Sequence, residues 1–293
     1  NDKTIKVDKA LWKYHGGLAN FDVDWSKDSR WLTYSRGLEN RHGAIFVFDV
    51  ENEEGHQLTS GYYDDSNPAF DPDGKYIYYL TNRTFKPEYS DMDNSFIYPN
   101  TTNLAVLPLR KDVESPLKPK NDEVEITKEE EKKKDDENGE DEESKKEEEK
   151  AIEIDIENIE NRAEVISKVD AGNYTNVTAV SGKITYHKYP NTGSDSKSKP
   201  IKYYDLEERE EKTILDDADG YMLSSNGEKM LVSKSKNFYV VDVQASQKLE
   251  KQVSTSDLEM KVDPKKEWKQ IFMDAWRFER DFFYDPNMHG VDW

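Results

Sequence analysis

The five histidines of this chain are the side chains best suited to acid–base or metal chemistry, and their spacing supports no metal site. His15, His42, His56 and His187 are scattered over expected loops and strand edges, without the short spacing of zinc ligands. His289 follows the last apolar segment, in a stretch that we interpret as a structural turn. The chain contains no cysteine, which excludes disulfides and thiolate ligands.

Motifs for cofactors and for serine hydrolases are also missing. The sequence has no Gly-x-Gly-x-x-Gly, no phosphate-binding loop and no Gly-x-Ser-x-Gly. The tetrapeptide at residues 71–74, DPDG, has part of a calcium-loop pattern, but it lacks the further ligands and the closing Glu. Asp, Pro and Gly in this order are typical of a tight turn between strands. We therefore predict no cofactor and no metal in this chain.

The turn at residues 71–74 belongs to a repeat. An aromatic residue precedes a polar turn twice, at Trp25 and at Phe70, which lie 45 residues apart, and an alternating strand follows each time at residues 30–34 and 75–79. A third strand comes next in both copies. This length and pattern predict a β-propeller blade, a small antiparallel sheet that must pack against its neighbours. We expect Trp25 and Phe70 to be buried between neighbouring blades.

Two weaker copies of this pattern complete the all-β region. One covers the strands expected at residues 173–215, and the last one begins near Gly220, with the turn at residues 225–229 in the place of the first two turns. We predict about four blades of a larger ring, and an additional strand near residues 4–7. The content of 17 Tyr, 11 Phe and 6 Trp suits the apolar layers between blades.

The most acidic part of the chain is residues 121–150, with 16 Asp or Glu and 7 Lys. Such a segment cannot bury enough apolar surface to offset its ordering entropy, so we interpret it as a disordered insertion within a blade. Strict alternation resumes at residues 152–156, where we expect the interrupted blade to continue. The predicted organisation is therefore propeller blades at 1–120, the insertion at 121–150 and further blades at 151–255.

Residues 256–293 change from a period of two to a period of 3.6. Asp263 is expected to cap an amphipathic helix that has Pro264 in its first turn and ends by Tyr284. The motifs of this last segment, WKQIF at 268–272, RDFFYD at 280–285 and HGVDW at 289–293, resemble the opening of the core region of tricorn proteases, a serine peptidase family. Upstream, IDIENIENR at 154–162 and AGNY at 171–174 are similar to the second propeller of the same family.

This resemblance implies a six-bladed and a seven-bladed propeller followed by a core with a PDZ-like module and a catalytic half, in proteins that trim oligopeptides. The chain would be the later part of the second, seven-bladed propeller and the first helix of the core. The family's catalytic Ser and His have no counterpart at motif-matched positions here. The resemblance therefore implies that this segment has no catalytic residue, although the longer protein is a serine peptidase.

Two classes of function stay open. In the first, the segment is a noncatalytic propeller that gates oligopeptides and scaffolds the rest of its own polypeptide and further copies of itself. In the second, it is a protein-interaction propeller of the TolB or WD type without peptidase activity. A prolyl oligopeptidase propeller would instead continue into an α/β-hydrolase, which the helix at Pro264 does not suggest.

Composition excludes other partners. The formal charge is −20, from 42 Lys and Arg against 62 Asp and Glu, and so acidic a chain would repel nucleic acid. No apolar stretch has the roughly 18 residues of a membrane span. We expect a cytoplasmic location, or a periplasmic one if an export signal lies upstream of Asn1.

Overall fold

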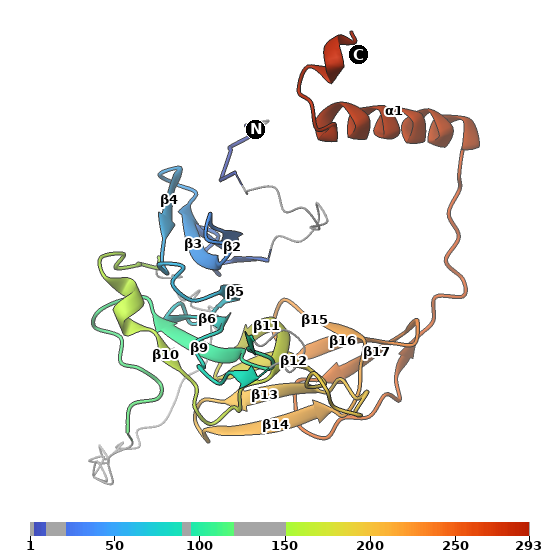
Figure 1. The fold of residues 1–293 in the computed structure, drawn as a ribbon. Helices are drawn as coiled ribbons and strands as arrows, with labels where there is room; N and C mark the ends of the chain where they lie inside the picture. The colour runs from blue at the N-terminus through green and yellow to red at the C-terminus, as the bar shows by residue number, and fades with distance from the viewer. Residues whose placement is uncertain (1–2, 10–21, 90–94, 120–150, 293) are drawn as a thin grey trace, which may run out of the picture. The chain divides into compact units, whose positions relative to one another are not determined.

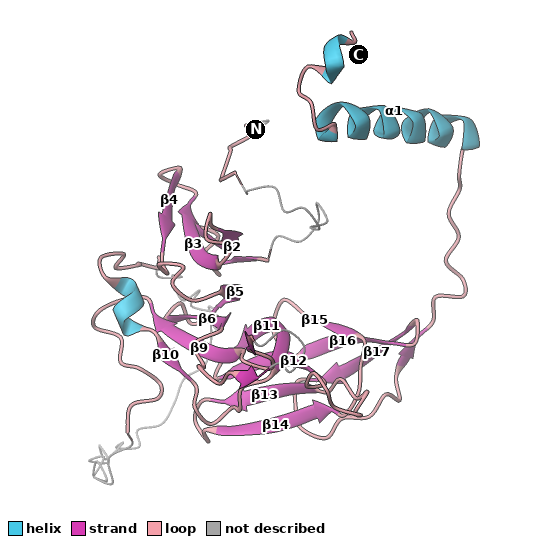
Figure 2. Cartoon of the chain, in the orientation of Figure 1, coloured by secondary structure: helices cyan, strands magenta, loops and turns pink. Residues whose placement is uncertain are grey.

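Four antiparallel sheets of four strands make up most of the structure, which confirms the prediction of about four blades. The computed structural model describes residues 3–9, 22–89, 95–119 and 151–292. The acidic segment at 121–150 lies outside these ranges. The chain divides into two compact units, Asn1–Gln252 with the sheets and Val253–Trp293 with the helix, and each is described by itself (Figures 1 and 2).

Each sheet is built from strands that follow one another in the sequence. The first sheet contains β1 (Val23–Trp25), β2 (Trp31–Gly37), β3 (Gly43–Asp49) and β4 (Glu54–Gln57). The second contains β5 (Asp65–Phe70), β6 (Tyr76–Thr81), β9 (Asn103–Pro108) and β10 (Glu164–Val165), with the separate hairpin of β7 (Glu88–Tyr89) and β8 (Phe96–Ile97) between β6 and β9. The third contains β11 (Asn173–Val180), β12 (Lys183–Tyr189), β13 (Ile201–Asp205) and β14 (Glu210–Leu215). The fourth contains β15 (Gly220–Leu223), β16 (Lys229–Lys234), β17 (Asn237–Asp242) and β18 (Gln252–Val253).

The first strands of the sheets form the inner side of the partial ring. β1 contacts β5, and β5 contacts β11, across the boundaries between sheets. Within each sheet the later strands then follow outward, as Figure 1 shows for β11 to β14. We call β1, β5, β11 and β15 the axial strands.

The register confirms the repeat seen in the sequence. Trp25 pairs with Leu32 in the first sheet, and Phe70 pairs with Ile77 in the second. In the fourth sheet the equivalent pair is Leu223 with Met230. The last turn therefore starts at residue 224, one residue earlier than the motif at 225–229 indicated.

The burial predicted for the two aromatic residues is correct for Phe70 and wrong for Trp25. Phe70 is 4% exposed and packs in the apolar cluster between the first and second sheets. Trp25 is 52% exposed. Its pairing with Leu32 places it on the face of the first sheet that points away from the second, where none of the described strands packs.

Two expected strands are absent from the described residues. Residues 152–156 pair in no sheet. Their alternation instead packs Ile152, Ile154 and Ile156 against the cluster between the first two sheets. Residues 4–7 also form no strand, although Ile5 and Val7 pack on the first sheet. In both places the apolar period reports burial of one face, not strand pairing.

The second unit is a helix followed by a turn. Helix α1 (Pro264–Phe282) begins with Asp263 as its N-cap, whose side chain accepts a hydrogen bond from the backbone N–H of Lys265 at 3.2 Å. This confirms the predicted start of the helix. Within the unit its apolar side chains are exposed, including Trp268 and Phe272. No helix in the described ranges is long and apolar enough to cross a membrane.

Phe70 provides a test of the interface between the first two blades. Phe70→Ala should lower the free energy of unfolding by about 3–5 kcal/mol, because the truncation leaves a cavity between two sheets. Phe85→Ala is the matched control and should change it by less than about 0.5 kcal/mol, since Phe85 is 82% exposed. Urea unfolding of the protein measures both values. Equal effects of the two substitutions would contradict the proposed packing.

Candidate functional site

The three histidines that the structure describes in the unit with the sheets form no shared site. His187 on β12 is buried, and its Nε2 donates to the carbonyl oxygens of Lys199 at 3.0 Å and Ala218 at 3.2 Å. Both partners can only accept, so Nε2 carries the proton, and burial lowers the pKa of this imidazole. His42 and His56 lie apart from it in the first sheet region, and His15 falls outside the described residues. His187 is therefore a structural tie between the third and fourth blades.

His289 lies in the short turn Met288–Gly290, as the sequence indicated. Its Nδ1 is 3.2 Å from a carboxylate oxygen of Asp285, and its Nε2 contacts the hydroxyl of Tyr284. The Asp285 carboxylate also accepts from the backbone N–H of His289 at 3.0 Å and of Asn287 at 2.9 Å. These contacts close the turn. They include no serine nucleophile.

A metal site is equally unsupported. In the ranges that the structure covers, no group of three or more His, Asp or Glu side chains could hold a metal ion. Residues 71–74 form the turn between β5 and β6, where Asp71 N donates to Tyr76 O and Gly74 N donates to Asp71 O. The same two backbone bonds occur at Ser26 in the first blade and at Ser224 in the fourth. The turn interpretation of this motif is therefore correct.

Side-chain amides connect the axial strands to one another. Asn67 Nδ2 donates to Asp22 Oδ2 at 3.0 Å, and Asn67 Oδ1 accepts from the backbone N–H of Asn176 at 2.7 Å. Asn176 Nδ2 then donates to the carbonyl of Tyr221 at 3.1 Å. This amide relay links the axial regions of all four blades and lines the inner side of the ring with polar groups.

Both asparagines lie at equivalent irregularities of the sheet. Asn67 and Asn176 have left-handed φ angles of 52° and 54°, and each falls where the register of its strand shifts. Asn tolerates this conformation better than other side chains except Gly. No motif in the sequence predicts a role for these two residues. A signal was present in the spacing, because Asp22 and Asn67 are separated by the same 45 residues as Trp25 and Phe70.

The axial strands contain two acidic residues and no basic one. β1, β5, β11 and β15 contain Asp24 and Asp65 but no Lys or Arg. Asp24 Oδ2 accepts from the backbone N–H of Phe70 at 2.7 Å. Burial raises the pKa of both carboxyl groups above their usual range. Both carboxyl groups are thus held between blades, where burial favours their neutral form.

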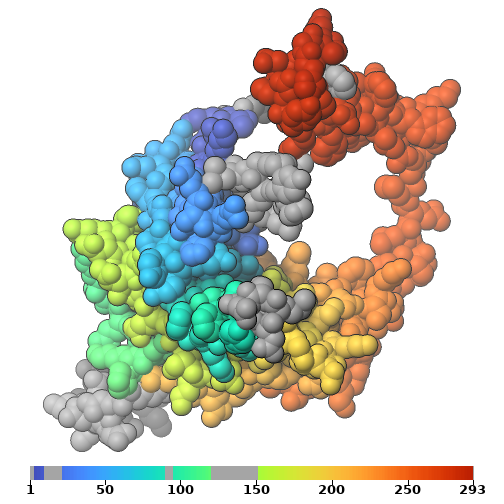
Figure 3. All heavy atoms as spheres, in the orientation of Figure 1, coloured from blue at the N-terminus to red at the C-terminus, as the bar shows by residue number. Residues whose placement is uncertain are grey.

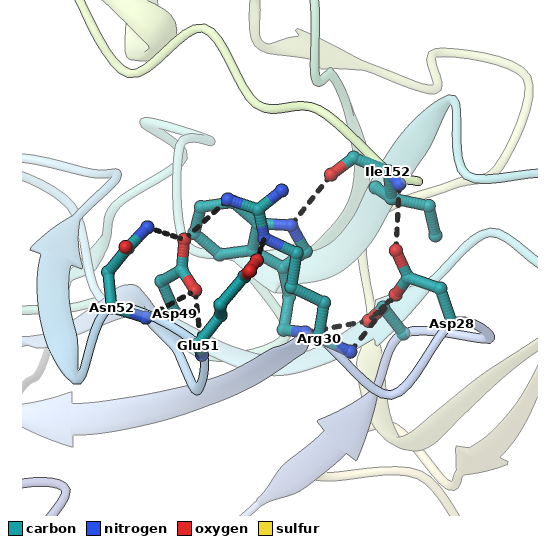
Figure 4. A network of polar contacts seen from close by, with 8 residues as sticks. Asp28, Arg30, Asp49, Glu51, Asn52 and Ile152 are labelled. Carbon is teal, nitrogen blue, oxygen red and sulfur yellow. Dashed lines mark hydrogen bonds and ion pairs between the residues drawn. The ribbon is translucent and has the colours of Figure 1, made fainter. Parts of the chain in front are cut away.

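The turn that follows β1 binds Ile152, which comes shortly after the acidic segment (Figure 4). Ile152 N donates to Asp28 Oδ2 at 2.7 Å, and the Trp31 indole Nε1 donates to Ile152 O at 2.8 Å. Arg30 Nη2 donates to Asp49 at 2.8 Å beside these contacts. Burial alone would raise the pKa of Asp49, but the hydrogen bonds from Arg30 and Asn52 lower it to about 2.

Two arginines bind backbone carbonyl groups of the chain before and after the acidic segment. The Arg162 guanidinium donates to the carbonyl oxygens of Pro108 at 3.0 Å and Leu109 at 3.1 Å. Arg209, in the third blade, donates to Pro116 O at 3.1 Å and to Lys118 O. The two chain segments that flank residues 120–150 are thus fixed to the blades by their own hydrogen bonds.

Comparison with known proteins agrees with this geometry. Residues 13–244 match the family model of the tricorn protease second beta propeller domain, and residues 264–293 match that of the tricorn protease C1 domain. The chain belongs to the tricorn protease family. The two matches assign the four blades to the second propeller domain and α1 to the C1 domain.

Relatives and a solved structure extend this result. The chain is 25% identical over 93% of its length to "Putative tricorn protease homolog 2" of Streptomyces coelicolor, and 24% identical over 92% to "Tricorn protease" of Thermoplasma volcanium. It spans 24% and 25% of these relatives, that is, about a quarter of their length. A crystal structure of the tricorn protease superposes with a TM-score of 0.69 at 21% identity, over 95% of this chain and 26% of that one.

Asp71 should make stability depend on pH. It is 3% exposed, and burial raises its pKa to about 6 despite the hydrogen bond from Lys75 N. The folded state therefore binds this proton more tightly than the unfolded state, and the stabilisation is lost as pH rises from about 4 to about 6. Relative to Asp71→Asn, the unaltered protein should lose about 1–3 kcal/mol between pH 4 and pH 7.

Asp28→Asn is the matched control with the opposite sign. Partial burial would raise the pKa of Asp28, but hydrogen bonds from Ser26 and from Ile152 N hold it below its usual value. Stability from this group is therefore lost as pH falls. Urea unfolding at pH 4, 5.5 and 7 compares the three proteins. The same pH trend for both variants would show that the environment of Asp71 is wrongly described.

The hydrogen bonds around Ile152 and Arg162 make the acidic segment dispensable for folding. Replacing residues 127–150 with a Gly/Ser linker of about ten residues should shift the melting temperature by less than about 2 °C, because loop length has a weak effect on closure entropy. Limited trypsin digestion of the unaltered protein should cut first at the lysines of this segment. A drop of many degrees would mean that the segment packs on the blades.

Proposed function

We propose that this chain is a noncatalytic part of the second propeller of an oligopeptide-cleaving serine peptidase, where it gates peptides and scaffolds the rest of its polypeptide. The match of residues 13–244 to the second propeller domain carries this proposal. The match of residues 264–293 to the C1 domain favours it over a free-standing interaction propeller. We place the serine, the histidine and the oxyanion donors outside this chain, and the protein in the cytoplasm.

The axial strands support a role in passing peptides. An extended peptide presents backbone donors and acceptors along its whole length, and the inner side of the ring offers matching polar groups from Asp22, Asn67 and Asn176. The Asp22 carboxylate beside β1 and the net charge of −20 would favour cationic peptides through an electrostatic effect that salt screens over ~8–10 Å.

The outer sheets support the scaffold role. Val23 and Trp25 on the first sheet are each 52% exposed, and Met222 on the fourth sheet is 69% exposed. These side chains lie on the faces that point away from the neighbouring described blade. We propose that further blades of the same polypeptide cover both faces, because an apolar sheet face in a propeller packs on the next blade.

A side-by-side assay tests the function. The full-length protein should cleave fluorogenic oligopeptides and leave folded proteins intact, whereas this chain alone should cleave neither. Cationic peptides should be preferred, and the preference should weaken as salt increases. Asp22→Asn keeps an acceptor for Asn67 and should reduce this preference about two- to threefold at low salt. Glu51→Gln, which removes one charge from an exposed turn, is the control and should have no effect.

Two results would contradict the proposal. Turnover by this chain alone, abolished by His289→Ala, would place a catalytic site at the Tyr284–Asp285–His289 turn. A full-length protein without any peptidase activity would instead favour the interaction propeller.

A further inference from the structure

The second blade carries an exposed aromatic hairpin that the fold does not need. Strands β7 and β8 pair only with each other among the described strands, outside the four-stranded sheet. Phe85 is 82% exposed, Phe96 62% and Tyr98 50%. We call residues 85–89 and 95–98 the aromatic hairpin. Apolar surface of this kind, gathered on one element, marks an interaction site more often than scattered apolar residues do.

The exposed rings are organised in pairs. The ring centroids of Phe85 and Tyr98 are 5.8 Å apart, and those of Tyr89 and Phe96 are 6.2 Å apart in an edge-to-face arrangement. Aromatic side chains held in this way present a rigid contact area at a low cost in conformational entropy. The described residues of the hairpin contain one Lys and one Glu, Lys86 and Glu88. The side chains that the structure describes in the hairpin therefore present mainly apolar surface.

The base of the aromatic hairpin is attached to an axial strand. Asn100 Oδ1 accepts from Asn173 Nδ2 at 2.9 Å and from the backbone N–H of Thr192 at 2.8 Å. Thr102 and Gly172 exchange backbone hydrogen bonds of 3.1 and 2.9 Å. Asn173 is the first residue of β11. The hairpin therefore rises where the axial strand β11 begins, and Figure 3 shows blue-green atoms of the second blade on the face turned to the viewer.

The turns at the C-terminal ends of β1 and β5 both contact Ile152. The turn after β1 binds the segment at Ile152 through Asp28, and the turn after β5 contacts the same residue, since a Cβ on Gly74 would lie 2.7 Å from it. Polar turns and the returning chain occupy that side. Within the part of the chain that the structure describes, the aromatic hairpin thus gives the axial path an exposed apolar element at the end where β11 begins.

We propose that the aromatic hairpin docks extended oligopeptides with aromatic or aliphatic side chains at the entrance of the axial path. This inference rests on the proposed passage of peptides along the axial strands, and it adds a substrate class to it. Apolar side chains of the peptide pack on the Phe85 and Phe96 rings. Its backbone then reaches the polar groups at the start of β11.

The test uses the full-length protein and two peptide series of equal length and charge, one containing Phe and Leu and the other Ser and Asn at the same positions. The double variant Phe85→Ala, Phe96→Ala should raise KM for the apolar series about 5- to 20-fold, with kcat unchanged. Values for the polar series should stay constant. Leu258→Ala, at a residue that is 79% exposed outside the hairpin, should leave both series unchanged.

A binding measurement separates this proposal from the proposed function. Fluorescence anisotropy of a labelled, noncleavable apolar peptide should show the same 5- to 20-fold weakening in the double variant, even if the protein cleaves no peptide. Equal effects on both series, or none, would overturn the docking role. A lower melting temperature or an altered oligomeric state in the double variant, with unchanged peptide binding, would show that another protein surface covers the hairpin and would also overturn it.

Discussion

Burial of both faces of each sheet is the constraint on which the structure depends. On β6, Ile77 and Tyr79 belong to the apolar cluster shared with the first blade, while Tyr78 and Leu80 belong to the cluster shared with the third. All four side chains are at most 2% exposed. A four-stranded sheet with two such faces is not stable alone, so the blade becomes a folding unit only between two neighbours. The exposed outer faces of the first and fourth blades are the same constraint left unsatisfied within the described residues.

The polar contacts follow from this burial. Backbone and carboxylate groups that fall between blades are far from water and need partners from the protein itself. The repeated turn gives these partners locally, since Ser26 Oγ and Ser224 Oγ each accept from the backbone N–H five residues later at 2.8 and 3.0 Å. The axial asparagines do the same across blades. Their left-handed backbone lets one amide satisfy groups on both neighbouring strands.

Much of the fold could be predicted from the sequence because the repeat and the period-two pattern are local. The pairs of Trp25 with Leu32 and of Phe70 with Ile77 follow from matching turns. Exposure of Trp25 could not be predicted, because it depends on what packs on the other side of the sheet. The strand expected at residues 152–156 was wrong for a related reason. Alternation reports the burial of one face, and it cannot distinguish a strand from a segment that packs without pairing.

The candidate site was less predictable than the fold. The resemblance of the last helix indicated the family, but no motif pointed to the amide relay or to the aromatic hairpin. Asn67 acquires its role through Asp22 and Asn176, which lie in two other blades. Tyr98 and Phe85 are brought together by a hairpin between β6 and β9 that the repeat does not contain.

The repeated positions and the departures from the repeat thus have different roles in this structure. Positions that recur in the first, second and fourth blades, such as the turn after the axial strand, are occupied by residues that hold the blades together. The features with chemistry to offer a partner are those that break the repeat, since the apolar side chains packed between blades are not available to a peptide. Asn67 and Asn176 lie at shifts in register, and Phe85 and Phe96 lie in an inserted hairpin. In a propeller, departures from the repeat are therefore the places where function can be added without loss of the packing that every blade requires.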